Sequence, residues 1–180
     1  MKELSLNILD IAENSVKAGA SLTKIHISET DDTVVITITD NGCGMTEEIL
    51  KSVTNPFYTT RTTRKVGMGL PLLKLEAEQT GGEVTVESKP QCDYPEDHGT
   101  VVCARFNKKH IDFTPLGDVI SSIITLIQGH PDTDFLFEHN VSGKTVRLDT
   151  RELRTVLEDV PLNSYEVINW IREYLAEQYS

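Results

Sequence analysis

Residues 9–20, LDIAENSVKAGA, combine an apolar helical period with three polar side chains on one side. Asp10, Asn14 and Lys17 follow one another at spacings of four and three residues, so a helix places them on one face. Asparagine is disfavoured inside helices, because its amide competes for backbone hydrogen bonds. Taken alone, the stripe is most simply a solvated helix face, so the rest of the sequence must decide whether it forms a site.

The composition favours a cytoplasmic protein without a nucleic-acid or membrane partner. The 180 residues carry a formal net charge of −11, and an acidic chain repels a phosphate backbone. No apolar run is long enough to span a bilayer, and acids interrupt the first one, unlike in a signal peptide. The three cysteines form no CxxC pair, which fits a reducing compartment and gives no zinc motif.

Apolar periods and β-branched runs alternate along the first part of the chain. They predict helices at residues 4–18, from 46 onward and at 68–80, and strands at 22–28, 33–39, 83–88 and 100–106. The turn DNGCGM, residues 40–45, ends the second strand, and residues 55–67 form a loop without a period. These elements fill residues 1–108, which we expect to form the first domain.

The composition changes near residues 107–110, where we predict a domain boundary. Residues 1–110 carry 12 basic and 16 acidic side chains, whereas residues 111–180 carry 5 and 12. The second part predicts a helix with Leu116 through Ile127 on one apolar face, a hairpin and two further helices. We expect residues 111–180 to form a small α/β module that binds a partner or forms a homodimer. Alternatively, this part completes the core of the first domain.

Several motifs occur in a set order: an acid–x3–Asn helix, a strand ending in DxGxG, a loop containing phenylalanine, GxGL opening a helix, and a strand opening with Gly-Thr. This layout resembles the GHKL ATPases, the superfamily of gyrase, heat-shock chaperones, histidine kinases and MutL. ENSVKAGA looks like the first motif of MutL, whereas NPFYTTR, GMGLPLLK and GGEVTVES look like the core of sensor histidine kinases.

The resemblance covers residues 1–108 and implies the Bergerat fold. That fold is a two-layer α/β sandwich (α+β) with a mixed, mainly antiparallel sheet, to which residues 111–180 would add a small α/β appendage. The resemblance also implies that the chain binds ATP and Mg²⁺.

The resemblance gives the polar stripe of the first helix a role. Asn14 would coordinate Mg²⁺ through its amide oxygen. That role would explain why an asparagine, which is disfavoured inside helices, is kept at this position on a rigid helix. Asp10 lies where many relatives carry a glutamate that polarises the attacking water or hydroxyl, and is one methylene shorter. Lys17 would pair with phosphate, although it is about as well explained as an exposed helix lysine.

The same resemblance assigns the adenine end of the site to the strand end and the glycine-rich turn. Asp40 would accept a hydrogen bond from the adenine amine, and Gly42 and Gly44 would let the backbone pass close to the base. Met45 would pack against the ring. Thr100 would reach the base, unless it is only a β-branched strand residue.

Residues 58–66 would form the ATP lid, which is cationic in an otherwise acidic protein. The alternative is a mobile loop kept soluble by its charge. A helix beginning near residue 68 offers free N–H groups to phosphate. The residues expected to bind nucleotide in this region are Thr60, Arg61, Gly67, Met68, Gly69 and Leu70, and the lid also carries Arg64 and Lys65.

Three functions remain open on the sequence alone. The first is a soluble kinase or ATPase in signal transduction that acts on a partner protein in trans, since no phosphoacceptor histidine hairpin is recognised. The second is an ATP-gated binding module with little turnover, which aspartate at position 10 favours slightly. The third is a MutL-like clamp, which the small size and acidic charge disfavour.

Overall fold

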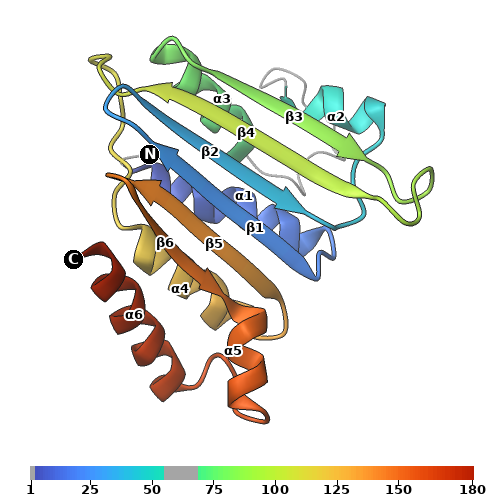
Figure 1. Ribbon diagram of the computed structural model, residues 1–180. Helices are drawn as coiled ribbons and strands as arrows, with labels where there is room; N and C mark the ends of the chain where they lie inside the picture. The colour runs from blue at the N-terminus through green and yellow to red at the C-terminus, as the bar shows by residue number, and fades with distance from the viewer. Residues whose placement is uncertain (1–2, 55–68) are drawn as a thin grey trace.

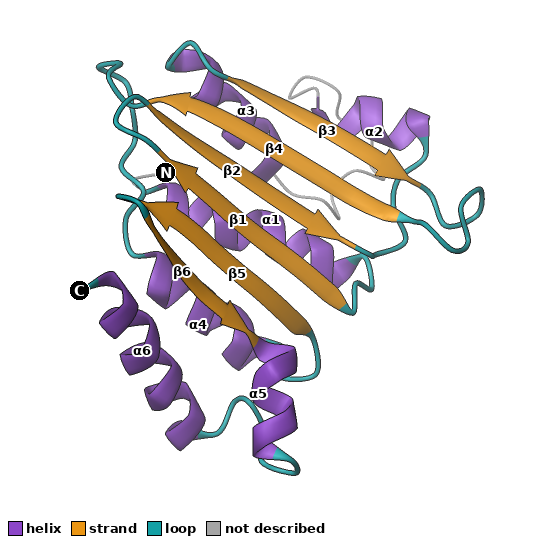
Figure 2. Ribbon diagram, in the orientation of Figure 1, coloured by secondary structure: helices purple, strands orange, loops and turns teal. Residues whose placement is uncertain are grey.

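The structure is a computed structural model that describes residues 3–54 and 69–180. One sheet runs through it, with helices α1, α3 and α4 along the same face (Figures 1 and 2). The helices are α1 (Leu4–Lys17), α2 (Glu47–Thr54), α3 (Gly69–Gln79), α4 (Val119–Gly129), α5 (Thr150–Leu157) and α6 (Tyr165–Tyr179). The strands are β1 (Leu22–Glu29), β2 (Thr33–Asp40), β3 (Glu83–Lys89), β4 (Gly99–Asn107), β5 (Asp134–Val141) and β6 (Lys144–Asp149).

The sheet has six strands in the order β3-β4-β2-β1-β5-β6. Strands β1 and β5 are parallel, and the other four neighbouring pairs are antiparallel. The structure therefore confirms the predicted α+β fold with a mixed, mainly antiparallel sheet.

The core lies between the sheet and its helices. Ile25 of β1 is paired with Ile38 of β2 and Phe137 of β5, and Ile38 is paired with Val102 of β4. Alternate residues of a strand point to the same face, so these four side chains form one buried row across the sheet. The alternation that predicted the strands from the sequence is this burial pattern.

Helix α1 packs at the centre of the helical layer. Its apolar side chains Leu4, Ile8, Ile11 and Ala12 are buried, and the helix contacts α3 on one side and α4 on the other. The opposite positions of the helix remain available for polar residues. A helix fixed in this way gives the side chains of its last two turns a defined position.

The second part of the chain continues the same sheet. Strand β5 lies beside β1, and β6 joins β5 through a tight turn in which Ser142 and Gly143 have φ angles of 52° and 75°. Positive φ at both positions is what a two-residue hairpin turn of type I′ requires. The core cluster includes side chains from both parts of the chain. The division into residues 1–108 and 111–180 as separate folding units remains a prediction.

One predicted boundary in the second part is wrong. The helix expected to include Leu116 begins at Val119, because Asp118 caps it: its carboxylate accepts a hydrogen bond from the Ser121 backbone N–H at 3.0 Å. Leu116 still packs against the core from the preceding loop.

Helix α6 is attached to the sheet by partly buried polar contacts at its end. The Tyr179 hydroxyl lies 2.7 Å from His139 Nδ1, and His139 Nε2 lies 3.0 Å from the Glu29 carboxylate. A carboxylate only accepts, so Nε2 carries the proton and Nδ1 accepts from the tyrosine. The Gln178 side chain accepts a hydrogen bond from the Arg147 backbone N–H and donates one to the Arg147 carbonyl on edge strand β6. The end of α6 is therefore fixed in place.

Among residues 3–54 and 69–180, none of the helices has the length and apolar character that crossing a bilayer demands.

We expect Phe137→Ala to lower the free energy of unfolding by about 3–5 kcal/mol, because it opens a cavity in the buried row. Phe137 is fully buried between β1 and β6. Urea unfolding followed by circular dichroism measures the change. Val156→Ala, at a side chain that is 80% exposed, is the control and should change stability little. Equal effects of the two substitutions would contradict this assignment of the core.

Candidate functional site

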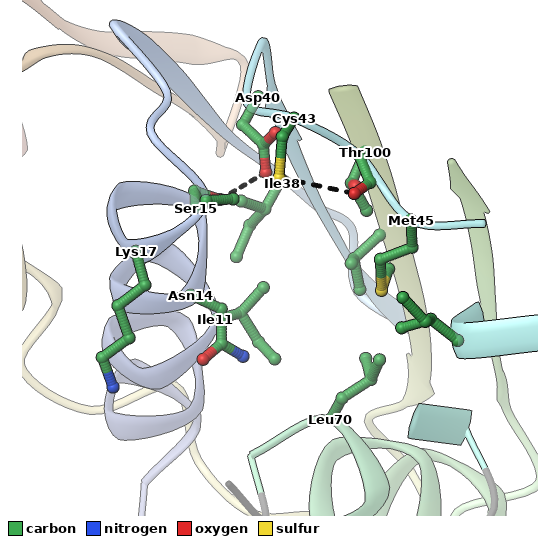
Figure 3. A pocket seen from close by; sticks show the side chains of 14 residues that line it. Ile11, Asn14, Ser15, Lys17, Ile38, Asp40, Cys43, Met45, Leu70 and Thr100 are labelled. Atoms are coloured by element: carbon green, nitrogen blue, oxygen red, sulfur yellow. Dashed lines mark hydrogen bonds between the residues drawn. The ribbon is translucent and has the colours of Figure 1, made fainter. Parts of the chain in front are cut away.

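A cavity of about 350 Å³ lies between the last turns of α1, the end of β2 and the beginning of α3 (Figure 3). Its size is within the range of small-molecule sites. The side chains and backbone that line it are Ile11, Asn14, Ser15, Lys17, Ala18, Ile38, Asp40, Cys43, Gly44, Met45, Ile49, Leu70, Thr100 and Val102. Most of this lining is apolar, and the polar groups come mainly from α1 and from the strand ends.

The Asp40 carboxylate is held in a fixed orientation at one end of the cavity. The Ser15 hydroxyl donates to Oδ2 at 2.7 Å, and the Gly42 backbone N–H donates to Oδ1 at 2.9 Å. The Ser15 bond ties the end of β2 to α1 (Figure 3). A carboxylate can accept about four hydrogen bonds, so capacity remains for a donor inside the cavity.

The glycines after Asp40 let the turn pass close to two other segments. A Cβ at Gly42 would lie 2.8 Å from the Cβ of Ala18, and the next residue, Cys43, donates its N–H to the Ala18 carbonyl. Gly44 has a φ of +70°, and a Cβ there would overlap the Lys89 carbonyl. Glycine is therefore required at both positions for the turn to form this wall of the cavity.

Hydroxyl groups fix the opposite wall, formed by β3 and β4. The Met45 N–H donates to Ser88 Oγ at 2.7 Å, and Ser88 donates to the Gly99 carbonyl at 3.1 Å. Ser88 and Thr100 hydroxyls lie 2.8 Å apart. Because the Ser88 proton points to Gly99, Thr100 is the donor of that pair and keeps lone pairs that can accept. Met45 and Thr100 both line the cavity.

The side chain of Asn14 lines the cavity. Its side chain points from α1 toward the open space, and Lys17 lies along the same helix one turn later (Figure 3). In the described part of the chain, neither side chain has a hydrogen bond or ion pair to another residue. Both therefore have free polar groups to offer to a ligand.

Asp10 lies beside the cavity rather than in its lining. It is exposed, and a Cβ built at Gly69 would lie 3.1 Å from the Asp10 Cβ and 3.8 Å from Oδ2. Helix α3 therefore begins close to this carboxylate. Partial burial raises the pKa of Asp10, and Glu13 raises it further, whereas Lys17 lowers it. A raised pKa makes the carboxylate a better proton acceptor.

The other residues predicted for the site divide into two groups. Leu70 lines the cavity from the first turn of α3, next to Gly69. Four residues lie outside the described part of the chain, as do the lid cations Arg64 and Lys65: Thr60, Arg61, Gly67 and Met68.

Sequence analysis missed two kinds of contributor. Ser15 and Ser88 form hydrogen bonds to the predicted residues Asp40 and Met45. The sequence signal for Ser15 was its position next to Asn14 in the motif. The apolar walls, such as Ile38 and Val102, look like ordinary strand residues. Asn7, three residues before Asp10 on α1, is not part of the cavity, because it is fully buried and its amide donates to Glu76 of α3 at 3.0 Å.

Comparison with known proteins establishes the family. Residues 2–110 match the family model described as histidine kinase-, DNA gyrase B-, and HSP90-like ATPase. This match takes in more than half of the chain, so the protein belongs to that ATPase family. The family residues include every cavity-lining residue described above.

Relatives in sequence include histidine kinases. The chain is 30% identical over 94 residues to the signal transduction histidine-protein kinase AfsQ2 of Streptomyces coelicolor, covering 50% of this chain and 18% of that one. It is 36% identical over 89 residues to sporulation kinase E of Bacillus subtilis, covering 49% of this chain and 12% of that one. The chain thus corresponds to less than a fifth of each kinase, and the ATPase domain is of the histidine kinase type.

A solved structure supports the fold over a longer stretch. The Aquifex aeolicus MutL ATPase domain complexed with ADP matches with a TM-score of 0.56 and 14% identity, covering 88% of this chain and 70% of that chain. Coverage of this extent reaches well beyond residue 110, so part of the second segment shares the arrangement of the MutL domain.

We expect Gly44→Ala to lower the free energy of unfolding by about 1–3 kcal/mol, because it combines positive φ with a collision against the Lys89 carbonyl. Gly129→Ala is the control, since a Cβ there meets nothing within 4 Å and its φ is not positive. Thermal unfolding of both variants measures the difference. A Gly44→Ala variant as stable as the control would show that the turn does not need this conformation.

Proposed function

We propose that this chain binds Mg-ATP in the cavity at the end of α1 and acts on a partner protein as a histidine kinase-like ATPase. The observation that carries the proposal is the juxtaposition of Asn14 and Asp40 in one cavity, with the Asp40 carboxylate already oriented by Ser15 and Gly42. The family match and the histidine kinase relatives support it.

The adenine end of the proposed complex lies at Asp40. Its remaining acceptor capacity suits the exocyclic amine of adenine, which guanine does not present at that position. Ile38, Met45 and Val102 supply apolar surface for a flat ring beside it. Thr100 adds an oxygen that can accept a hydrogen bond, directly or through water. The Asp40 carboxylate, held in a fixed direction, would therefore select the base.

The phosphate end lies along α1 toward α3. The free amide oxygen of Asn14 is a hard neutral ligand of the type that Mg²⁺ takes, so the residues fit this ion. When bound, Mg²⁺ would supply positive charge to the phosphates. Lys17 would supply further charge from the next turn, because its ammonium forms no salt bridge among residues 3–54 and 69–180.

We propose that the acceptor group belongs to another protein. Each of the five histidines of the chain has a hydrogen-bond partner within the fold, which suits a structural role for these rings. These partners are Asn140 for His26, the Gly42 carbonyl for His98, the Asp112 N–H for His110, Glu13 for His130, and Glu29 with Tyr179 for His139. Asp10, with its raised pKa, would accept the proton of the attacking hydroxyl or water.

The position of Asp10 favours one alternative function. Asp10 lies outside the lining of the cavity and carries a short side chain. If its carboxylate does not reach the reacting group, nucleotide binding would change the protein's shape with little turnover. The chain would then be an ATP-gated binding module that regulates its partner.

We expect Asn14→Asp to weaken Mg-ATP binding by about tenfold, because the new carboxylate would place a negative charge facing the phosphates. Isothermal titration calorimetry with ATP and excess Mg²⁺ measures the affinity. Asn163→Asp, in the exposed loop before α6, makes the same change of charge away from the cavity and should leave affinity unaltered. Unchanged affinity in Asn14→Asp would count against Asn14 as the ligand.

Phosphotransfer distinguishes the proposed kinase from the ATP-gated module. The chain is incubated with γ-labelled ATP, Mg²⁺ and a lysate of its source, beside an Asp10→Asn variant. Label on a partner protein with the wild type, and a loss of about a hundredfold or more in the variant, supports kinase action. Tight ATP binding without label or phosphate release by either protein supports the binding module instead.

A further inference from the structure

We propose that the outer face of α6 is a docking surface for a basic segment of a partner protein, one that carries arginine or lysine. We call this surface the acidic aromatic face and define it as Trp170 and Tyr174 with the glutamates Glu166, Glu173 and Glu177. In Figure 1, α6 is the outermost helix beside α4 and β6. The surface lies outside the family-matched residues 2–110.

The aromatic pair Trp170 and Tyr174 lies on the surface rather than in the core. The Trp170 and Tyr174 rings stack with centroids 4.7 Å apart and an interplanar angle of 12°. Their exposed fractions are 47% and 38%, which is high for large aromatic residues. Stacked aromatic side chains present a flat π surface, and tryptophan and tyrosine are enriched among residues that dominate binding energy.

The three glutamates flank the same face. Glu166 and Glu173 lie four residues before and three residues after Trp170, and Glu177 lies three residues after Tyr174, so one side of the helix carries all five side chains. All three glutamates are exposed. Across residues 3–54 and 69–180, none of them forms a salt bridge or side-chain hydrogen bond. Their charges are therefore available to a partner.

The helix holds this face rigidly. Val167, Ile171 and Leu175 are buried on its opposite side, and the partly buried contact between Tyr179 and His139 holds its end. A surface that is ordered before binding loses little conformational entropy when a partner docks. The acidic aromatic face is thus preorganised.

Charge decides which partner fits. A guanidinium or ammonium group is attracted both to an aromatic ring face and to carboxylates. Residues 111–180 carry 12 acidic and 5 basic side chains, so a second copy of the chain would bring the same negative charge to the contact. Like charges facing each other oppose association, which favours a cationic protein segment over a homodimer through this face.

The test uses a short capped peptide that alternates arginine with alanine, and a glutamate–alanine peptide for comparison, without nucleotide. Trp170 is the only tryptophan in the chain, so its fluorescence reports directly on this face. We expect the arginine peptide to change the emission in a saturable way and the glutamate peptide to leave it unchanged. Calorimetry then measures the affinity of the arginine peptide for the variants.

Two variants are compared with a control of equal charge. The combined substitution Glu166→Gln, Glu173→Gln and Glu177→Gln, and separately Trp170→Ala with Tyr174→Ala, should each weaken binding by about tenfold. The control changes three other exposed glutamates, Glu78, Glu87 and Glu96, to glutamine and should alter affinity by less than about twofold at physiological salt.

If the control variant weakened binding as much as the triple variant on α6, general charge attraction would explain the effect. That result would overturn the proposal. Sedimentation that shows a dimer in the wild type and a monomer in Trp170→Ala would also overturn it, because a second copy would then cover the face. Loss of ATP binding in other experiments would leave this result unaffected, so the two proposals fail separately.

Discussion

The short hydrogen bond from Ser15 to Asp40 joins the two elements on which the candidate site depends. One partner lies on α1, one residue after Asn14, and the other ends β2 and begins the glycine-rich turn. The Gly42 N–H holds the second carboxylate oxygen. As a result, the fold fixes the distance between Asn14, the candidate metal ligand on α1, and Asp40, the candidate acceptor for adenine. Such fixed polar groups on rigid elements give a site its selectivity.

The rest of the chain keeps α1 in position for that contact. The sheet packs beneath it, α3 lies on one side, and α4 of the second segment lies on the other. The Ser122 hydroxyl of α4 also donates to the Ser5 carbonyl of α1 at 2.9 Å, in a buried bond. Residues beyond 110 therefore support the ATPase fold directly, and they also carry the acidic aromatic face on α6. The same chain thus carries both the candidate nucleotide site and the proposed docking surface.

Much of the fold could be predicted from the sequence, because its signals are local. Alternation in TVVITITD follows from a strand with one buried face, and the DNGCGM turn marks where it ends. The order β3-β4-β2-β1-β5-β6 could not be derived that way, since the parallel pairing of β1 with β5 joins segments more than 100 residues apart. In the site, Asn14, Asp40 and Thr100 carry recognisable motifs, whereas Ser88 contributes through a bond made only after folding. Leu116 was misplaced because an apolar period does not reveal the cap at Asp118.

The central claim is that the oriented Asp40 carboxylate selects adenine, and calorimetric titration of ATP and GTP into wild type and Asp40→Asn tests it most directly. The account predicts that the wild type prefers ATP by about tenfold or more, and that the variant loses most of this preference while keeping its folded circular dichroism spectrum. An unchanged ratio of ATP to GTP affinity in a folded Asp40→Asn variant would contradict it.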